Sequence, residues 1–137
     1  MSAHYDLALQ EFWKGTLGDL TSGGIPVKVR LMRASAYAFS QAHQFASALP
    51  AALATDVVLG AKTANGAGAS PGCLDAGDAT FLSVPPGAAI NCLAAFRDTG
   101  DPATSPLLFY IDGFSVIPNG GDITVQWANA PPFIAKL

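Results

Sequence analysis

Short alternating segments in the second half of the chain are the feature that most constrains its fold. Every second residue is apolar in these segments, a period typical of strands with one face turned to a core. Turn-forming sequences separate four of them, at residues 79–84, 88–96, 106–112 and 122–128. The second half is therefore predicted to be an antiparallel β module. The clearest alternation is carried by Ile90, Cys92, Ala94 and Phe96, and by Ile123, Val125 and Trp127.

The first half of the chain mixes helical and strand signals. Apolar and aromatic residues at helical spacing predict a short amphipathic helix over residues 4–17. Residues 26–32 alternate apolar with charged side chains, which predicts a half-buried strand, and residues 55–63 form a plausible second strand. Residues 42–49 suggest one or two helical turns, which Pro50 would end.

About six strands and little helix predict a mainly β protein. The first expectation is an antiparallel β-sandwich or jelly roll with a short N-terminal helix, and a partly open barrel comes second. The length of 137 residues fits a single domain over 1–137. Residues 64–77 are rich in glycine and alanine and are predicted to be a flexible loop, while the prolines at the start of 131–137 predict a C-terminal arm.

The composition indicates surface that faces a partner. Half of the chain is apolar but only 12% is charged, about half the usual share of charged residues. A membrane is disfavoured as this partner, because the alanine-rich stretch 45–58 is interrupted by Pro50 and Asp56 and is too short to span a bilayer. No secretory signal is visible at the N-terminus. A net charge of -3 and the lack of a basic cluster also disfavour direct nucleic-acid binding.

The reactive residues do not form a recognisable catalytic or metal motif. His4 and His43 lack metal-ligand spacing, and no nucleophile elbow is present, so no catalytic, cofactor or metal site is predicted. Cys73 and Cys92 are predicted to be reduced thiols, with a bridge between them left as the alternative. The aspartates around Gly100 are predicted to form turns, and calcium ligation is the less favoured alternative.

Exposed apolar side chains are the candidates for an interface. Trp127 is in register with Ile123 and Val125, so we expect it to be buried. Tyr110 lies on the opposite side of its strand from Phe109, and we expect it to be exposed. The predicted interface residues are Phe12, Trp13, Tyr110, Phe133, Ile134 and Leu137.

Two neighbouring segments carry a resemblance to a known family. They are FRDTGDPATSPLLFYID at residues 96–112 and NGGDITVQW at residues 119–127. With a helix in front, a Gly-Thr-Leu step at 15–17 and a strand at 27–32, the chain resembles short structural proteins of tailed-phage particles. The resemblance covers most of the chain, although residues 50–77 are richer in alanine and glycine than is usual in these proteins.

The resemblance implies a non-enzymatic virion component of the capsid cement or decoration type, similar to the jelly-roll cement proteins of podophages. It implies that the partners are the major capsid protein and a second copy of the chain, in a homodimer rather than a homotrimer. It places the protein on the capsid exterior after assembly in the host cytoplasm. The main alternative is a tail or fibre component whose β-sandwich binds a host carbohydrate, since fold does not fix function.

Overall fold

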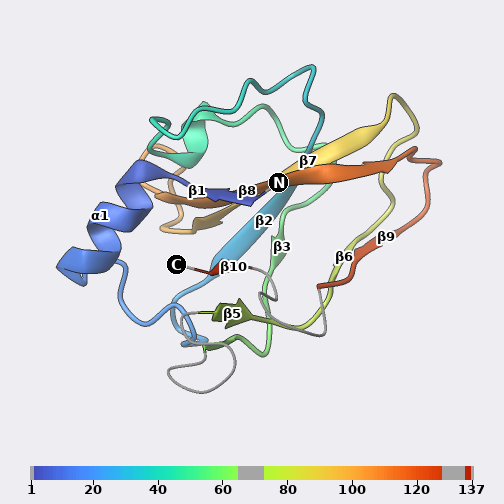
Figure 1. Ribbon diagram of the computed structural model, residues 1–137. Coiled ribbons are helices and arrows are strands. Elements are labelled where there is room, and N and C mark those ends of the chain that lie inside the picture. The colour runs from blue at the N-terminus through green and yellow to red at the C-terminus, as the bar shows by residue number, and fades with distance from the viewer. Residues whose placement is uncertain (1, 65–72, 128–134, 137) are drawn as a thin grey trace.

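Antiparallel strands make up most of the fold. The computed structural model describes residues 2–64, 73–127 and 135–136, with one short α-helix beside the strands (Figure 1). The mainly β class is therefore confirmed, and the arrangement is compatible with a sandwich or jelly roll. The largest sheet has five strands in the order β1-β8-β7-β2-β3. Their bounds are β1 Ser2–His4, β8 Leu107–Val116, β7 Ile90–Arg97, β2 Val27–Met32 and β3 Val57–Val58.

Two smaller sheets accompany the large one. A three-stranded sheet has the order β10-β5-β4, and a two-stranded ribbon pairs β6 with β9. The bounds are β4 Thr63–Ala64, β5 Cys73–Asp75, β6 Ala79–Phe81, β9 Ile123–Val125 and β10 Ala135–Lys136.

Two predictions for the middle of the chain are wrong. Residues 55–63 form two short strands, β3 and the start of β4, because Ala61 takes a φ of 50° and turns the chain between them. The predicted loop 64–77 contains β5, which is paired on both sides. Pairing with β4 and β10 outweighs the local composition there. Residues 65–72 lie outside the described residues.

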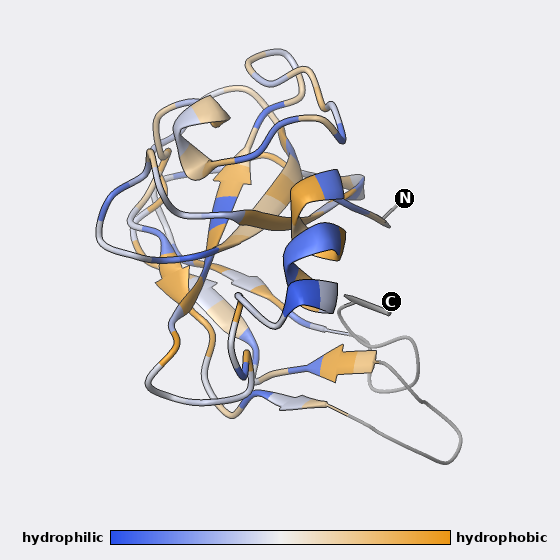
Figure 2. Ribbon diagram, turned by 90° about the vertical axis from the view of Figure 1, so that its left-hand side faces the viewer, coloured by the Kyte–Doolittle hydropathy of each residue, from blue (hydrophilic) through white to orange (hydrophobic). Residues whose placement is uncertain are grey.

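The helix α1 spans Asp6–Lys14 and is shorter than the predicted 4–17. His4 belongs to β1, where it lies opposite Phe109 of β8, so the chain is extended before the helix begins. The helix ends because Gly15 has a φ of 73°, and its N–H is bonded to the carbonyl of Phe12. Much of α1 is hydrophilic in Figure 2, while the five-stranded sheet contains strongly hydrophobic stretches.

The predicted helical turns at 42–49 are a single 3₁₀ turn, η1, at Ala46–Ala48. Its neighbour Phe45 forms an isolated bridge with Pro106, and Leu107 donates its N–H to the carbonyl of Gln44. This part of the chain is thereby attached to the start of β8.

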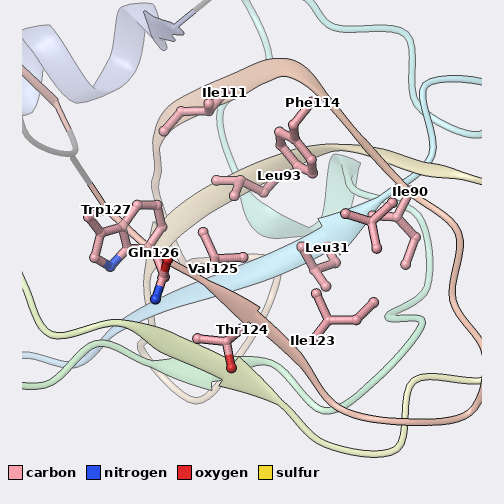
Figure 3. Close-up of a pocket in the computed structure, with 11 residues that line it drawn as sticks. Leu31, Ile90, Leu93, Ile111, Phe114, Ile123, Thr124, Val125, Gln126 and Trp127 are labelled. Carbon is pink, nitrogen blue, oxygen red and sulfur yellow. The ribbon is translucent and has the colours of Figure 1, made fainter.

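One side of the five-stranded sheet, here called the groove face, is defined by Leu31, Leu93 and Ile111. These residues lie opposite one another on β2, β7 and β8, and directly opposed residues in antiparallel pairs project to the same side. The ribbon of β6 and β9 lies over this face, and Val125 and Trp127 come close to it (Figure 3). Trp127 is buried, as predicted, and its indole N–H donates to the carbonyl of Gly77.

The other side of the sheet, here called the aromatic face, is defined by Arg30, Ala94 and Tyr110. Residues 33–56 cover it. The ring of Phe39 stacks on that of Tyr110 with centroids 4.4 Å apart. The Arg30 guanidinium is paired with Asp56 at 2.7 Å, which attaches the end of the covering segment to β2.

Candidate binding surface

The exposed apolar side chains begin with an aromatic pair on α1. Phe12 is 44% exposed and Trp13 is 84% exposed, which agrees with their prediction as surface residues. Their rings meet edge to face with centroids 5.6 Å apart. Only Ala8 of this helix is buried, so α1 contributes little to the core and presents both rings to solvent. A fixed aromatic pair of this kind offers contact area with little loss of side-chain freedom.

Tyr110 was predicted to be exposed, and this is wrong: it is only 3% exposed. The alternation along β8 correctly places Tyr110 and Phe109 on opposite sides of the sheet. Both sides are covered at this point, because Tyr37 and Phe39 pack against the Tyr110 ring. Tyr110 is therefore unavailable to a partner in this structure.

Three of the predicted interface residues, Phe133, Ile134 and Leu137, lie outside the described residues. Of the predicted arm 131–137, the backbone of Ala135–Lys136 is described, and it forms β10. This strand pairs with Leu74 and Cys73 of β5. The end of the arm is thus joined to a sheet of its own chain.

An apolar groove of about 360 Å³ separates β9 from the groove face (Figure 3). The sequence did not predict it. Leu31, Ile90 and Leu93, which come from β2 and β7, are buried residues of its lining, and Trp127 is a fourth. The remaining lining residues are Ile111, Phe114, Val116, Ile123, Thr124, Val125 and Gln126.

A bulge in β8 widens the apolar lining of the groove. Ile90 lies opposite Val116 and Cys92 lies opposite Asp112, so β8 has more residues than β7 over this stretch. Gly113 takes a φ of 94° within it, a conformation that favours glycine. Because of the bulge, both Ile111 and Phe114 line the groove, although a regular strand would place residues three apart on opposite faces.

Further exposed apolar residues lie at the end of β8 and elsewhere on the surface. Val116 lines the groove and is 37% exposed, and the next residue, Ile117, is 76% exposed. Leu82 and Val58 are also largely exposed. Among the described residues, the lining of the groove includes no charged side chain.

The aromatic face holds a hydrogen-bonded chain of side chains. The hydroxyls of Tyr5 and Tyr37 are 2.9 Å apart, and the Tyr37 hydroxyl is 2.9 Å from Nδ1 of His43. Burial raises the pKa of Tyr5 far above its usual value, and the Tyr37 hydroxyl adds to this effect. Tyr5 and Tyr37 are both buried, so these contacts fix the covering segment in place.

The buried thiol of Cys92 lies beside this cluster. Burial raises its pKa, while a hydrogen bond with Tyr110 acts in the opposite direction. Burial, Cys92 and Asp112 together raise the pKa of Tyr110. Cys73 and Cys92 are both buried and are not bridged to each other, so the structure does not support the alternative of a disulfide between them. A neutral, buried thiol with a raised pKa is a poor nucleophile.

The aspartates around Gly100 form turns, as predicted. Asp98 accepts a hydrogen bond from the N–H of Gly100, and Asp101 accepts one from the N–H of Ala103. Among the residues that the structure describes, His, Cys, Asp and Glu do not gather in a group of three suited to a metal ion. The described part of the chain also contains no helix with the length and apolarity needed to cross a bilayer.

Comparisons with known proteins add no relative. No protein-family model, curated protein sequence or solved structure matches the chain.

Proposed function

We propose that this protein is a non-enzymatic structural component of a phage particle. In this proposal it binds the exterior of the major capsid protein shell and strengthens it as a cement or decoration protein. It assembles in the host cytoplasm and binds neither membrane nor nucleic acid directly. The observation that carries the proposal is the exposed apolar surface of Trp13, Phe12 and Ile117 on a chain with few charges.

Exposed apolar groups favour a protein partner, because burying them against another chain removes apolar surface from water. A cement protein can rely on many weak sites, since each copy on a shell contributes its own contact area to neighbouring subunits. Such a role requires no catalytic residue. The resemblance of residues 96–112 and 119–127 to tailed-phage proteins favours the shell as this partner.

The second part of the proposal is that two copies of the chain pair across a symmetry axis over the joints between capsid subunits. A two-fold dimer uses the same surface on both copies, so one apolar patch serves both. Sedimentation equilibrium of the purified protein tests this part. A monomeric mass at the highest soluble concentration would contradict it, and a trimeric mass would replace the dimer.

Co-sedimentation with shells assembled without the protein tests the capsid role. We expect binding to saturate at a fixed ratio to the major capsid protein and the loaded shells to resist higher temperatures. Trp13→Ala should weaken binding by about tenfold, because exposed aromatic residues that become buried dominate interfaces. Gln10→Ala, an exposed change on the same helix, is the matched control and should bind normally.

A failure to bind shells would contradict the cement proposal and favour a tail or fibre role. The carbohydrate-binding alternative expects exposed aromatic rings around a polar groove. The described groove is apolar, and its tryptophan, Trp127, is buried, so the cement role is preferred.

A further inference from the structure

The hydrogen-bonded chain on the aromatic face leads from the interior of the protein to a titratable ring. It runs from the Tyr5 hydroxyl to the Tyr37 hydroxyl and on to Nδ1 of His43, and both contacts are 2.9 Å long. Tyr5 is completely buried and Tyr37 is 4% exposed, whereas His43 is half-buried. The histidine end of the chain can therefore exchange a proton with water.

The two contacts of this chain accommodate two protons. Burial raises the pKa of Tyr5 and of Tyr37, so each phenol keeps its proton at neutral and acidic pH. A phenol donates one hydrogen bond, and an imidazole nitrogen without a proton only accepts one. Tyr5 therefore donates to Tyr37, and Tyr37 donates to Nδ1 of His43. The neutral ring then carries its own proton on Nε2.

A proton on Nδ1 of His43 is one too many for this chain. If Nδ1 donated to Tyr37 and Tyr37 donated to Tyr5, the Tyr5 proton would need a further acceptor. Within the described residues, the structure gives the Tyr5 hydroxyl one hydrogen bond, and its partner is Tyr37. A buried donor without an acceptor is costly. Protonation therefore breaks the contact between Tyr37 and His43.

Titratable groups of β7 and β8 also face the two phenols. The ring of Tyr110 lies 6.1 Å from that of Tyr37 between centroids, and Cys92 and Asp112 hydrogen-bond to Tyr110. Burial raises the pKa of Tyr110 and of Cys92, so both stay neutral in acid. Carboxylates ordinarily keep their charge above about pH 4, while histidines change charge between about pH 5 and 8. Mildly acidic solution therefore acts on the histidine end of the chain.

Few regular elements hold this part of the covering segment in place. Residues 37–44 form neither a helix nor a strand. Two titratable residues of neighbouring elements contact the segment through their backbone, because Gln41 accepts the N–H of Asp6 at 2.9 Å and its side-chain amide donates to the carbonyl of His4. Irregular segments open locally at low cost, so the loss of one side-chain bond shifts their opening equilibrium.

We propose that His43 is a pH-sensitive latch, a contact that holds residues 37–44 on the aromatic face at neutral pH and releases them in acid. The unprotonated ring accepts the Tyr37 hydroxyl, and the protonated ring does not. Release separates the ring of Phe39 from that of Tyr110, which it contacts with centroids 4.4 Å apart. The protein thereby exposes aromatic surface in acidic surroundings. This device does not depend on the proposed capsid role.

Hydrogen exchange on the full chain tests the latch at about pH 7.5 and about pH 5, since ordinary carboxylates stay charged over this range. The amides of Asp6 and Tyr37 report release, because the first is bonded to the Gln41 carbonyl and the second lies in the segment. We expect their protection factors to fall about tenfold in acid, the effect of one lost hydrogen bond. The amide of Leu59, bonded to the carbonyl of Val27, should keep its protection.

The chain contains two histidines, which provides a matched control. His43→Gln removes the titrating ring, so the protection of the Asp6 amide should be the same at both pH values. His4→Gln removes the other histidine and should keep the fall in acid. Tyr37→Phe should lower the protection already at neutral pH and abolish the further fall, because no hydroxyl is left to release.

Equal protection of the wild-type Asp6 amide at both pH values would overturn the latch. A response that persisted in His43→Gln, or that disappeared in His4→Gln, would overturn it as well. A parallel fall at Leu59 would mean that acid unfolds the whole protein and not this segment alone. Nitrogen NMR of the wild-type ring is an independent check: neutral His43 should carry its proton on Nε2, and a proton on Nδ1 would contradict the proton count.

Discussion

The two faces of the five-stranded sheet are covered in different ways. The aromatic face is sealed by residues 33–56, where the Phe39 ring stacks on Tyr110 and the Tyr37 hydroxyl contacts the Tyr5 hydroxyl and the ring of His43. The groove face is covered by a two-stranded ribbon, and among the described residues an apolar groove remains between the ribbon and the sheet. The two faces therefore differ in how tightly the described residues pack against them. We expect the sealed face to contribute more to the stability of the fold than the groove face.

The largest expected effect is on the sealed face. Tyr110→Ala removes a buried ring that stacks on Phe39, and it should lower the free energy of unfolding by about 3–5 kcal/mol. Urea denaturation followed by tryptophan fluorescence measures the change. Trp13→Ala, an exposed aromatic change, should alter stability by less than about 0.5 kcal/mol. Similar losses for both variants would contradict the contrast between sealed and exposed aromatic residues.

A second change tests the hydroxyl chain on the same face. Tyr37→Phe removes the hydroxyl shared by Tyr5 and His43, and it leaves the buried Tyr5 hydroxyl without this partner. The free energy of unfolding should fall by about 1–3 kcal/mol, as measured by urea denaturation. Tyr5→Phe keeps the contact between Tyr37 and His43, so we expect a smaller loss. If Tyr5→Phe were the more destabilising change, the Tyr37 hydroxyl would not be the central group of this hydrogen-bonded chain.

On the groove face, the corresponding effect should be smaller. Phe114→Ala removes a partly buried ring from the lining of the groove and should lower the free energy of unfolding by about 1 kcal/mol. A loss as large as that of Tyr110→Ala would show that the groove face is part of the stabilising core.

The smallest effect concerns the ion pair between Lys28 and Asp98 at the border of the aromatic face. The Lys28 ammonium lies 2.9 Å from Asp98, and this contact, with the N–H of Gly100, lowers the pKa of Asp98. Since the folded pKa is depressed, the stabilisation is complete above the unfolded value and disappears as the pH falls through the folded value.

Asp98→Asn tests this contribution. At neutral pH the variant should be less stable by about 0.2–1 kcal/mol, the range for partly exposed pairs. Urea denaturation of both proteins from neutral to acidic pH should show the difference shrinking below the unfolded pKa. A difference that stayed constant at the most acidic pH would contradict the assignment, as would one insensitive to added salt at neutral pH.

Much of the secondary structure could be predicted because local patterns determine it. The predicted strand at 26–32 became β2, and the alternation at 88–96 became β7. The helix was found in the right place, but both its start and its end were wrong, because α1 spans Asp6–Lys14 and not 4–17. Local spacing does not reveal that Ser2–His4 pairs with β8, because the partner residues lie more than a hundred positions away.

The candidate surface was harder to predict. Phe12 and Trp13 were predicted as interface residues, and both are exposed on α1. Tyr110 was misjudged because alternation shows which residues share a face, but not whether a second layer covers it. The covering residues Tyr37 and Phe39 lie in a segment without regular periodicity. Their spacing therefore did not predict that they would pack against Tyr110.

The groove was missed for a different reason. Its lining comes from β2, β7, β8 and β9, and the bulge at Gly113 brings Phe114 to the same side as Ile111. A glycine inside an apolar strand is the one sequence signal that could have indicated the irregularity. It could not have indicated the depth of the groove, which depends on how the ribbon lies over the sheet.

The pairing of β1 with β8 has a consequence for biosynthesis. Ser2–His4 lie opposite residues 109–111, which come more than a hundred positions later in the chain. This edge of the sheet cannot close until those later residues have been translated, and such non-local pairing slows folding. Until then the strands that will form the core are exposed to other nascent chains. Yield in rapid overexpression should consequently depend on translation speed and temperature.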